Sequence, residues 1–151
     1  MRTRVVDRRP DERGAAALEF GLVVPIVLMM IFGIIQYGFM YWSLQTASAT
    51  AREAARSLIV GTTEACTLDR AEELADNPAV GGGAPVAVAR YFDTSGAATT
   101  GPVEGGMVEV EVSLTTLNLN MPFLPLPDGG NVVQTAQARV ENVPPVPLPC
   151  T

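Results

Sequence analysis

The chain has 151 residues, of which 10 are basic and 16 are acidic, so its formal net charge is -6. All ten basic residues are arginines, because the sequence contains neither lysine nor histidine. The acidic balance argues against a nucleic-acid partner. The lack of histidine excludes histidine-based catalytic triads, histidine-ligated metal sites and imidazole pH switches. We therefore expect a protein that is not an enzyme and has no metal, cofactor or small-molecule substrate.

The charged residues are unevenly placed along the chain. Residues 1–14 hold five arginines, whereas no charged residue lies between Glu19 and Arg52. Within this gap, residues 20–42 contain 15 Ile, Leu, Val, Phe or Met side chains, and Gln36 is the one strongly polar residue among them. A helix of this length is about 34 Å long, enough to cross the hydrocarbon core of a bilayer. We therefore expect a transmembrane helix over residues 20–42.

The arginines also indicate how this helix is oriented. Five of them precede the span and only two lie within a similar distance after it, and the more basic flank of a span usually faces the cytoplasm. The N-terminus is therefore expected in the cytoplasm and residues 43–151 outside it. Tyr37, Tyr41 and Trp42 would then lie at the outer interface, which favours aromatic rings with a polar edge.

Residues 13–20 (RGAAALEF) form the entrance to the span. A carboxylate at the edge of an apolar segment is costly unless a proton or a cation compensates it, and Glu19 lies there, five residues after Gly14. If the chain were cut between Gly14 and Ala15, the new amino group would lie one helical turn from Glu19. In an assembly, the amine of a neighbouring protein could reach the same carboxylate.

This entrance resembles that of the prepilin class, and the longer string GAAALEFGLVVPIVLMMIFGIIQYGFMYWSLQTASATAREAAR resembles the TadE-like family of tight-adherence pilus assembly proteins. The resemblance is strong over roughly residues 13–60. Farther on it is looser: residues 107–114, 121–127 and 134–141 are similar to the outer strands and connecting loop of the family.

The resemblance implies cleavage after Gly14 by a membrane-embedded prepilin peptidase, with Ala15 as the first mature residue and Glu19 in an assembly ion pair. The protein would then be a pseudopilin or minor pilin in the bacterial inner membrane that acts in assembly of a tight-adherence type IV pilus. Its partners would be the bilayer, the peptidase, and other pilins or pilus assembly proteins.

Two alternatives stay open at this point. In the first, Gly14 begins an unprocessed membrane helix, Glu19 is an ordinary acid at headgroup level, and the protein is a single-pass anchor with an extracytoplasmic binding domain. In the second, the small residues of Ala47-Ser48-Ala49 form a signal-peptidase site, and cleavage after Ala49 releases a secreted binding domain.

Beyond the span, residues 43–60 predict a helix that ends before Gly61. If it continues the membrane helix, residues 15–60 form one helix of about 70 Å. A narrow face of small or apolar residues at 3 and 4 spacing would permit close packing. This face consists of Leu44, Ala47, Ala51, Ala54, Ala55 and Leu58.

The outer region predicts a short helix over residues 67–76 capped by Thr67, and strands over 85–92, 107–114 and 131–141. Gly81-Gly82-Gly83 is expected to be a hinge and Asp128-Gly129-Gly130 a turn. In residues 107–114, alternation turns Val108, Val110, Val112 and Leu114 inward and Glu109 and Glu111 outward, where Arg139 could lie across from both acids.

The fold class is therefore α+β: a long N-terminal transmembrane helix that continues outward, then a small antiparallel sheet domain with one short helix. The expected parts are a cytoplasmic leader (1–14), the helix (15–60) and an extracytoplasmic domain with a proline-rich, extended tail (61–151). This domain has little aromatic mass, and such a thin core needs additional stabilisation. A disulfide between Cys66 and Cys150 would supply about 4 kcal/mol in the loop-entropy treatment.

Overall fold

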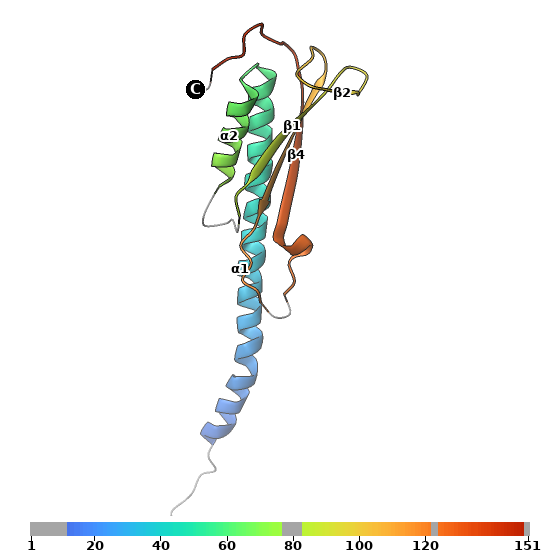
Figure 1. Cartoon of the computed structure of the whole chain (residues 1–151). Coiled ribbons are helices and arrows are strands. Elements are labelled where there is room, and N and C mark those ends of the chain that lie inside the picture. The colour runs from blue at the N-terminus through green and yellow to red at the C-terminus, as the bar shows by residue number, and fades with distance from the viewer. Residues whose placement is uncertain (1–11, 77–82, 122–123, 150–151) are drawn as a thin grey trace, which may run out of the picture. The chain divides into compact units, whose positions relative to one another are not determined.

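A computed structural model describes residues 12–76, 83–121 and 124–149 of the chain (Figure 1). The fold is α+β, as expected: a long N-terminal helix, a short second helix and a four-stranded antiparallel sheet. The chain divides into two units, and the boundary falls between Ile35 and Gln36. The elements in chain order are α1 (Glu12–Ile59), α2 (Glu64–Ala75), β1 (Val86–Phe92), β2 (Ala98–Thr99), β3 (Met107–Thr115), the 3-10 helix η1 (Pro127–Gly130) and β4 (Asn131–Arg139).

The first unit contains the N-terminal part of α1, and its apolar side chains are mostly exposed. The helical stretch Gly14–Ile59 is long and apolar enough to cross a membrane. Its most apolar 18-residue window has a mean hydropathy of 2.5 and is only 6% buried. Leaving so much apolar surface in water is unfavourable, whereas a bilayer would accommodate it. By length and composition, α1 is thus a candidate membrane span.

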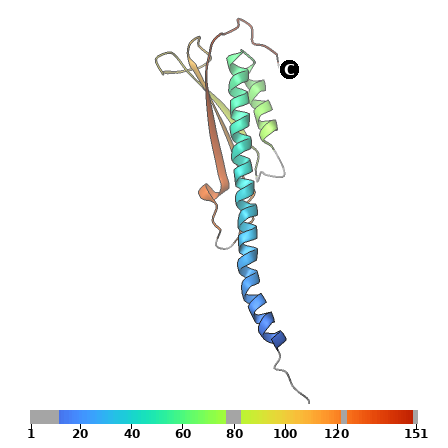
Figure 2. The ribbon, with the colours of Figure 1, turned by 180° about the vertical axis from the view of Figure 1, so that it is seen from behind.

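The second unit is built around an antiparallel sheet with strand order β2-β1-β3-β4. The sheet and α2 both lie beside the second-unit part of α1 (Figures 1 and 2). The inward alternation expected in β3 is confirmed, because Val108, Val110, Val112 and Leu114 are all buried in the core. Three of these valines are fully buried, so β3 is the central strand of the hydrophobic core.

The small-residue face of α1 is confirmed as a packing surface of this core. Ala47, Ala51, Ala54, Ala55 and Leu58 are buried, and Leu44 packs against them at the edge. Side chains this small let the helix backbone approach its neighbours closely. The helix ends at Ile59, and Gly61 follows with φ of 89°. A Cβ at Gly61 would lie 2.2 Å from Pro144 Cγ, so both the backbone conformation and the space require glycine here.

The expected cap of the second helix is wrong. α2 begins at Glu64, three residues before Thr67, and Thr67 lies buried inside it. The Thr67 hydroxyl donates to the carbonyl of Thr63 at 3.1 Å, a bond within a helical turn that satisfies the hydroxyl without capping. At the side of the sheet, Glu72 of α2 accepts a hydrogen bond from the Ala87 amide of β1 at 3.0 Å.

Arg139 does not lie across from the two acids of β3. The register of β3 and β4 pairs Arg139 with Met107, and Glu109 with Gln137. The cation that meets the acids is Arg90 of β1, whose guanidinium lies 3.3 Å from Glu109 and 2.9 Å from Glu111. The hydrogen bond and the charge of Glu111, with a smaller contribution from Glu109, raise the pKa of Arg90.

The C-terminal tail returns to the turn between α1 and α2. Leu148 forms a parallel bridge with Thr62, and its amide donates to the carbonyl of Gly61 at 2.8 Å. The backbone amide of Thr63 donates to the carbonyl of Leu148 at 3.2 Å. Cys150 and residues 77–82 lie outside the described residues, so the disulfide and the glycine hinge stay predictions.

Candidate functional site

The expected cleavage site lies at the start of α1. The helix begins at Glu12, so Gly14 and Ala15 both lie in its first turn, and both are exposed. A Cβ added at Gly14 would meet no atom of the described residues within 4 Å. The first four amides of a helix have no acceptor within it, so opening this turn breaks few hydrogen bonds. Gly14 and Ala15 are therefore both exposed in the part of the chain that the structure describes.

Glu19 lies one turn farther along the same helix and is also exposed. It is four residues from Ala15, a spacing that puts two groups on one face of a helix. Among the described residues, no salt bridge involves Glu19. The structure thus places Gly14, Ala15 and Glu19 on two consecutive turns of α1, with the Glu19 side chain exposed.

Gln36 has a role that the sequence reasoning missed. The sequence showed it only as the one strongly polar residue of an apolar span, but in the second unit Gln36 is only 1% exposed. Its Nε2 donates to the carbonyl of Leu117 at 2.7 Å, and its Oε1 accepts from the amide of Leu119 at 2.9 Å. The Gln36 amide therefore pairs with the backbone after β3 as a neighbouring strand would.

Further polar groups of α1 hold the same part of the chain. The Tyr37 hydroxyl donates to the carbonyl of Pro125 at 3.2 Å. The Ser43 hydroxyl donates to the Phe39 carbonyl and lies 3.0 Å from the Thr116 hydroxyl. Ser43 follows Gln36 by seven residues, which is two helical turns, so both side chains point the same way. The signal in the sequence was the seven-residue spacing of Gln36 and Ser43. This spacing does not by itself indicate which segment the two side chains bind.

The two acids of β3 share one arginine. Glu109 and Glu111 both bind Arg90, and Glu109 also accepts a hydrogen bond from Gln137 at 2.7 Å. Asp93 has a structural role as well: it accepts hydrogen bonds from Ser95 and Ala97, which lower the pKa of Asp93. No group of three or more metal-ligating side chains occurs among the residues that the structure describes.

Tyr91 also has a shifted pKa. Burial in the core, reinforced by the charge of Glu64 and a hydrogen bond with it, raises the pKa of Tyr91 well above its usual range. Tyr91 borders a hollow of about 180 Å³ that is also lined by Pro144 and Pro147 of the tail. Its lining is mostly apolar, and the two ionisable side chains that border it, Tyr91 and Glu64, are hydrogen-bonded to each other.

Comparison with known proteins finds a family match within the N-terminal helix α1. The family model described as TadE-like protein matches residues 14–56, while no curated protein and no solved structure matches the chain significantly. The matched stretch begins at Gly14, contains Glu19 and Gln36, and ends in the small-residue face of α1. The resemblance of the chain to the TadE-like family is therefore confirmed over residues 14–56.

Proposed function

We propose that the protein is a prepilin-like membrane protein, a pseudopilin or minor pilin, that acts in assembly of a tight-adherence type IV pilus and is processed after Gly14. The observation that carries the proposal is the TadE-like match over residues 14–56, whose first half is an exposed apolar helix. The match indicates a membrane protein related to tight-adherence pili. The TadE-like family is not an enzyme family.

The proposed cleavage creates a free amino group at Ala15, close to the carboxylate of Glu19. Cleavage of the peptide bond between Gly14 and Ala15 by a prepilin peptidase leaves the ammonium of Ala15 one turn from Glu19. A carboxylate at membrane depth is stabilised by such a partner. In an assembly, the ammonium of one mature chain pairs with Glu19 of its neighbour, and the exposed apolar side chains before Ile35 supply the lateral contact.

The proposed location is the bacterial inner membrane, with the N-terminus in the cytoplasm and the second unit outside. The five arginines before the span support this orientation. Oxidation is permitted outside the cytoplasm, which suits a disulfide between Cys66 and Cys150. The tail supports this bond, since Leu148 pairs with Thr62 close to the start of α2.

Release of a secreted domain by cleavage after Ala49 fits the structure poorly. Ala47 and Ala51 are both completely buried in the core of the second unit. A cut after Ala49 would split α1 between them and remove Gln36 and Ser43, whose side chains hold residues 116–119. The unprocessed single-pass anchor is therefore the remaining rival.

Two matched glycine substitutions separate these possibilities. Gly14 and Gly21 both lie in α1, and a Cβ at either position meets no atom within 4 Å in the part of the chain that the structure describes. In the native host, Gly14→Val should leave the chain at full length and abolish pilus formation, whereas Gly21→Val should be shortened by 14 residues as the unmodified chain is. If the unmodified chain keeps its leader and still supports pili, the protein acts as an unprocessed anchor.

A further inference from the structure

Residues 117–121 and 124–126, here called the connecting segment, follow β3 and precede η1. No charged residue lies between Glu111 and Asp128, so this part of the chain is as free of charge as the membrane span. Its apolar side chains are only partly covered: Leu119 is 38% exposed, and Met121, Leu124 and Leu126 are half-buried. Such a surface is unfavourable in water.

The connecting segment runs beside the part of α1 that belongs to the apolar run. Gln36 binds the backbone of Leu117 and Leu119, and Tyr37 binds the carbonyl of Pro125. Irregular backbone at membrane depth is tolerated only where its polar groups are paired within the protein. The Gln36 side chain supplies this pairing for two backbone groups of the segment.

The position of Glu19 indicates how deep this contact lies. If Glu19 is at headgroup level on the cytoplasmic side, the 16 residues from Phe20 to Ile35 span only about 24 Å, less than the roughly 30 Å of a hydrocarbon core. About four more residues of α1 are needed to cross. Gln36, and with it Leu117 and Leu119, would then lie at the outer edge of the hydrocarbon rather than in water.

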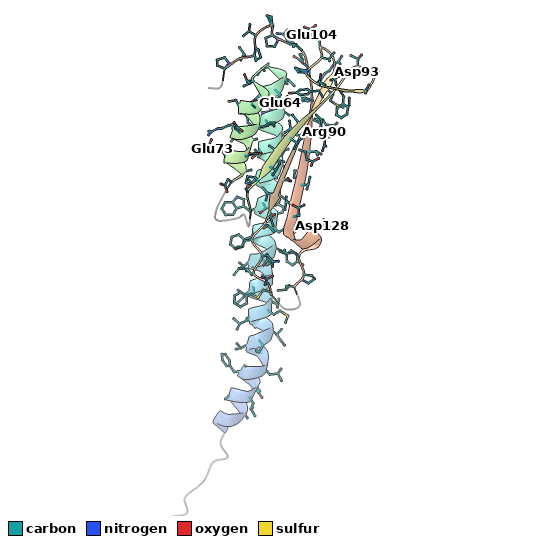
Figure 3. All side chains as sticks on the ribbon, viewed as in Figure 1. Glu64, Glu73, Arg90, Asp93, Glu104 and Asp128 are labelled. Atoms are coloured by element: carbon teal, nitrogen blue, oxygen red, sulfur yellow. The ribbon has the colours of Figure 1, made fainter. Side chains whose placement is uncertain are left out.

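We propose that the connecting segment is a second membrane contact, which lies in the outer interfacial layer of the bilayer with Leu119 against lipid. The proposal rests on the membrane orientation given under Proposed function. Two exposed asparagines limit the depth to the headgroup boundary, and the Asn120 amide is already paired with the Asn118 side chain at 2.8 Å. In Figure 3, Asp128 is at this end of the sheet, while Asp93 and Glu104 are at the other end.

Lipid fits this surface better than a second protein does. The exposed rings of Tyr41 and Trp42 follow within two turns on α1, and such rings are typical of the membrane interface. The backbone groups that Gln36 pairs need no strand from a partner. A small irregular apolar segment flanked by interfacial aromatic residues therefore matches the layer between headgroups and acyl chains.

Tryptophan fluorescence in reconstituted vesicles tests the proposal, because Trp42 is the one tryptophan of the chain. In a Trp42→Phe background, Leu119→Trp places the reporter in the connecting segment. Val103→Trp is its control, since Val103 is also 38% exposed and lies beside Glu104 in the chain, at the other end of the sheet. Leu124→Trp is a second reporter in the segment if Leu119→Trp alters the far-UV circular dichroism spectrum. The vesicles contain phosphatidylcholine brominated on its acyl chains, at a low protein-to-lipid ratio.

Brominated lipid should quench the reporter in the segment several-fold more strongly than Val103→Trp, and aqueous acrylamide should quench it less. Equal quenching of the two variants by acrylamide, with no quenching of either by lipid, would overturn the proposal. Protection of the segment reporter from both quenchers would also overturn it and indicate that a second copy of the chain covers the segment. Unmodified Trp42 is the reference: if lipid fails to quench it, the membrane anchoring itself is wrong, whereas quenching of Trp42 alone refutes only the second contact.

Discussion

Replacement of Gln36 by leucine tests whether this residue holds the chain after β3. The substitution removes both hydrogen bonds of a side chain that is 1% exposed, and it leaves the Leu117 carbonyl and the Leu119 amide without their partner. An unsatisfied buried polar group costs about 1–3 kcal/mol. Two such groups together cost about 2–6 kcal/mol, and burial of a leucine side chain returns about 1.5–3 kcal/mol. We therefore expect Gln36→Leu to lower the free energy of unfolding by about 1–3 kcal/mol.

Gln45→Leu is the matched control, because Gln45 lies on the same helix with its side chain exposed. Exposed substitutions of this kind usually change stability by less than about 0.5 kcal/mol. The measurement is denaturant unfolding of both variants in detergent micelles, followed by the fluorescence of Trp42, together with hydrogen exchange of the Leu119 amide. Gln36→Leu should unfold at a lower denaturant concentration, with faster exchange of that amide, and it should still insert into membranes. Equal midpoints and equal exchange rates in the two variants would refute the structural role of Gln36.

Three further predictions concern charge, the disulfide and pH. Glu19→Gln should insert and be cleaved normally yet lose crosslinking to other pilins, because the ammonium of the neighbouring Ala15 loses its counter-charge; crosslinking at the unmodified level would contradict the ion pair. In unreduced, unfolded protein, a thiol reagent should label neither Cys66 nor Cys150, and labelling of both would exclude the bond. The hydrogen bonds of Ser95, followed by that of Ala97, hold the pKa of Asp93 below its ordinary value, so its stabilising effect is present at neutral pH and disappears as the pH falls through the lowered pKa. Asp93→Asn should therefore lower the unfolding midpoint at pH 7 and have less effect in acid; an effect that grows in acid would refute this assignment.

Features with a local cause could be predicted from the sequence. The alternation of Val108, Val110, Val112 and Leu114 identifies the buried face of β3, because successive side chains of a strand point to opposite sides. Gly61 ends α1 for an equally local reason, its positive φ. The helical spacing of the small residues in α1 likewise identified the face that packs in the core.

Features that depend on strand register or on distant partners could not be predicted. Alternation shows which side of β3 the acids occupy, but not which arginine meets them, so Arg139 was expected where Arg90 is found. The start of α2 was misplaced because a threonine hydroxyl can satisfy a carbonyl inside a helix as well as cap its end. The partners of Gln36 lie 81 and 83 residues away, and no local pattern links them. β2 has only two residues, too few for a periodic signal.

The central claim is that the protein is processed as a prepilin, and the mature N-terminus tests it most directly. The measurement is mass spectrometry of the chain purified from membranes of its native host, with its N-terminal peptide sequenced. The account predicts a chain that begins at Ala15, whose amino group then lies one turn from Glu19. A chain that begins at Met1 would show an unprocessed anchor, and one that begins at Thr50 would show a secreted domain; either result would contradict the account.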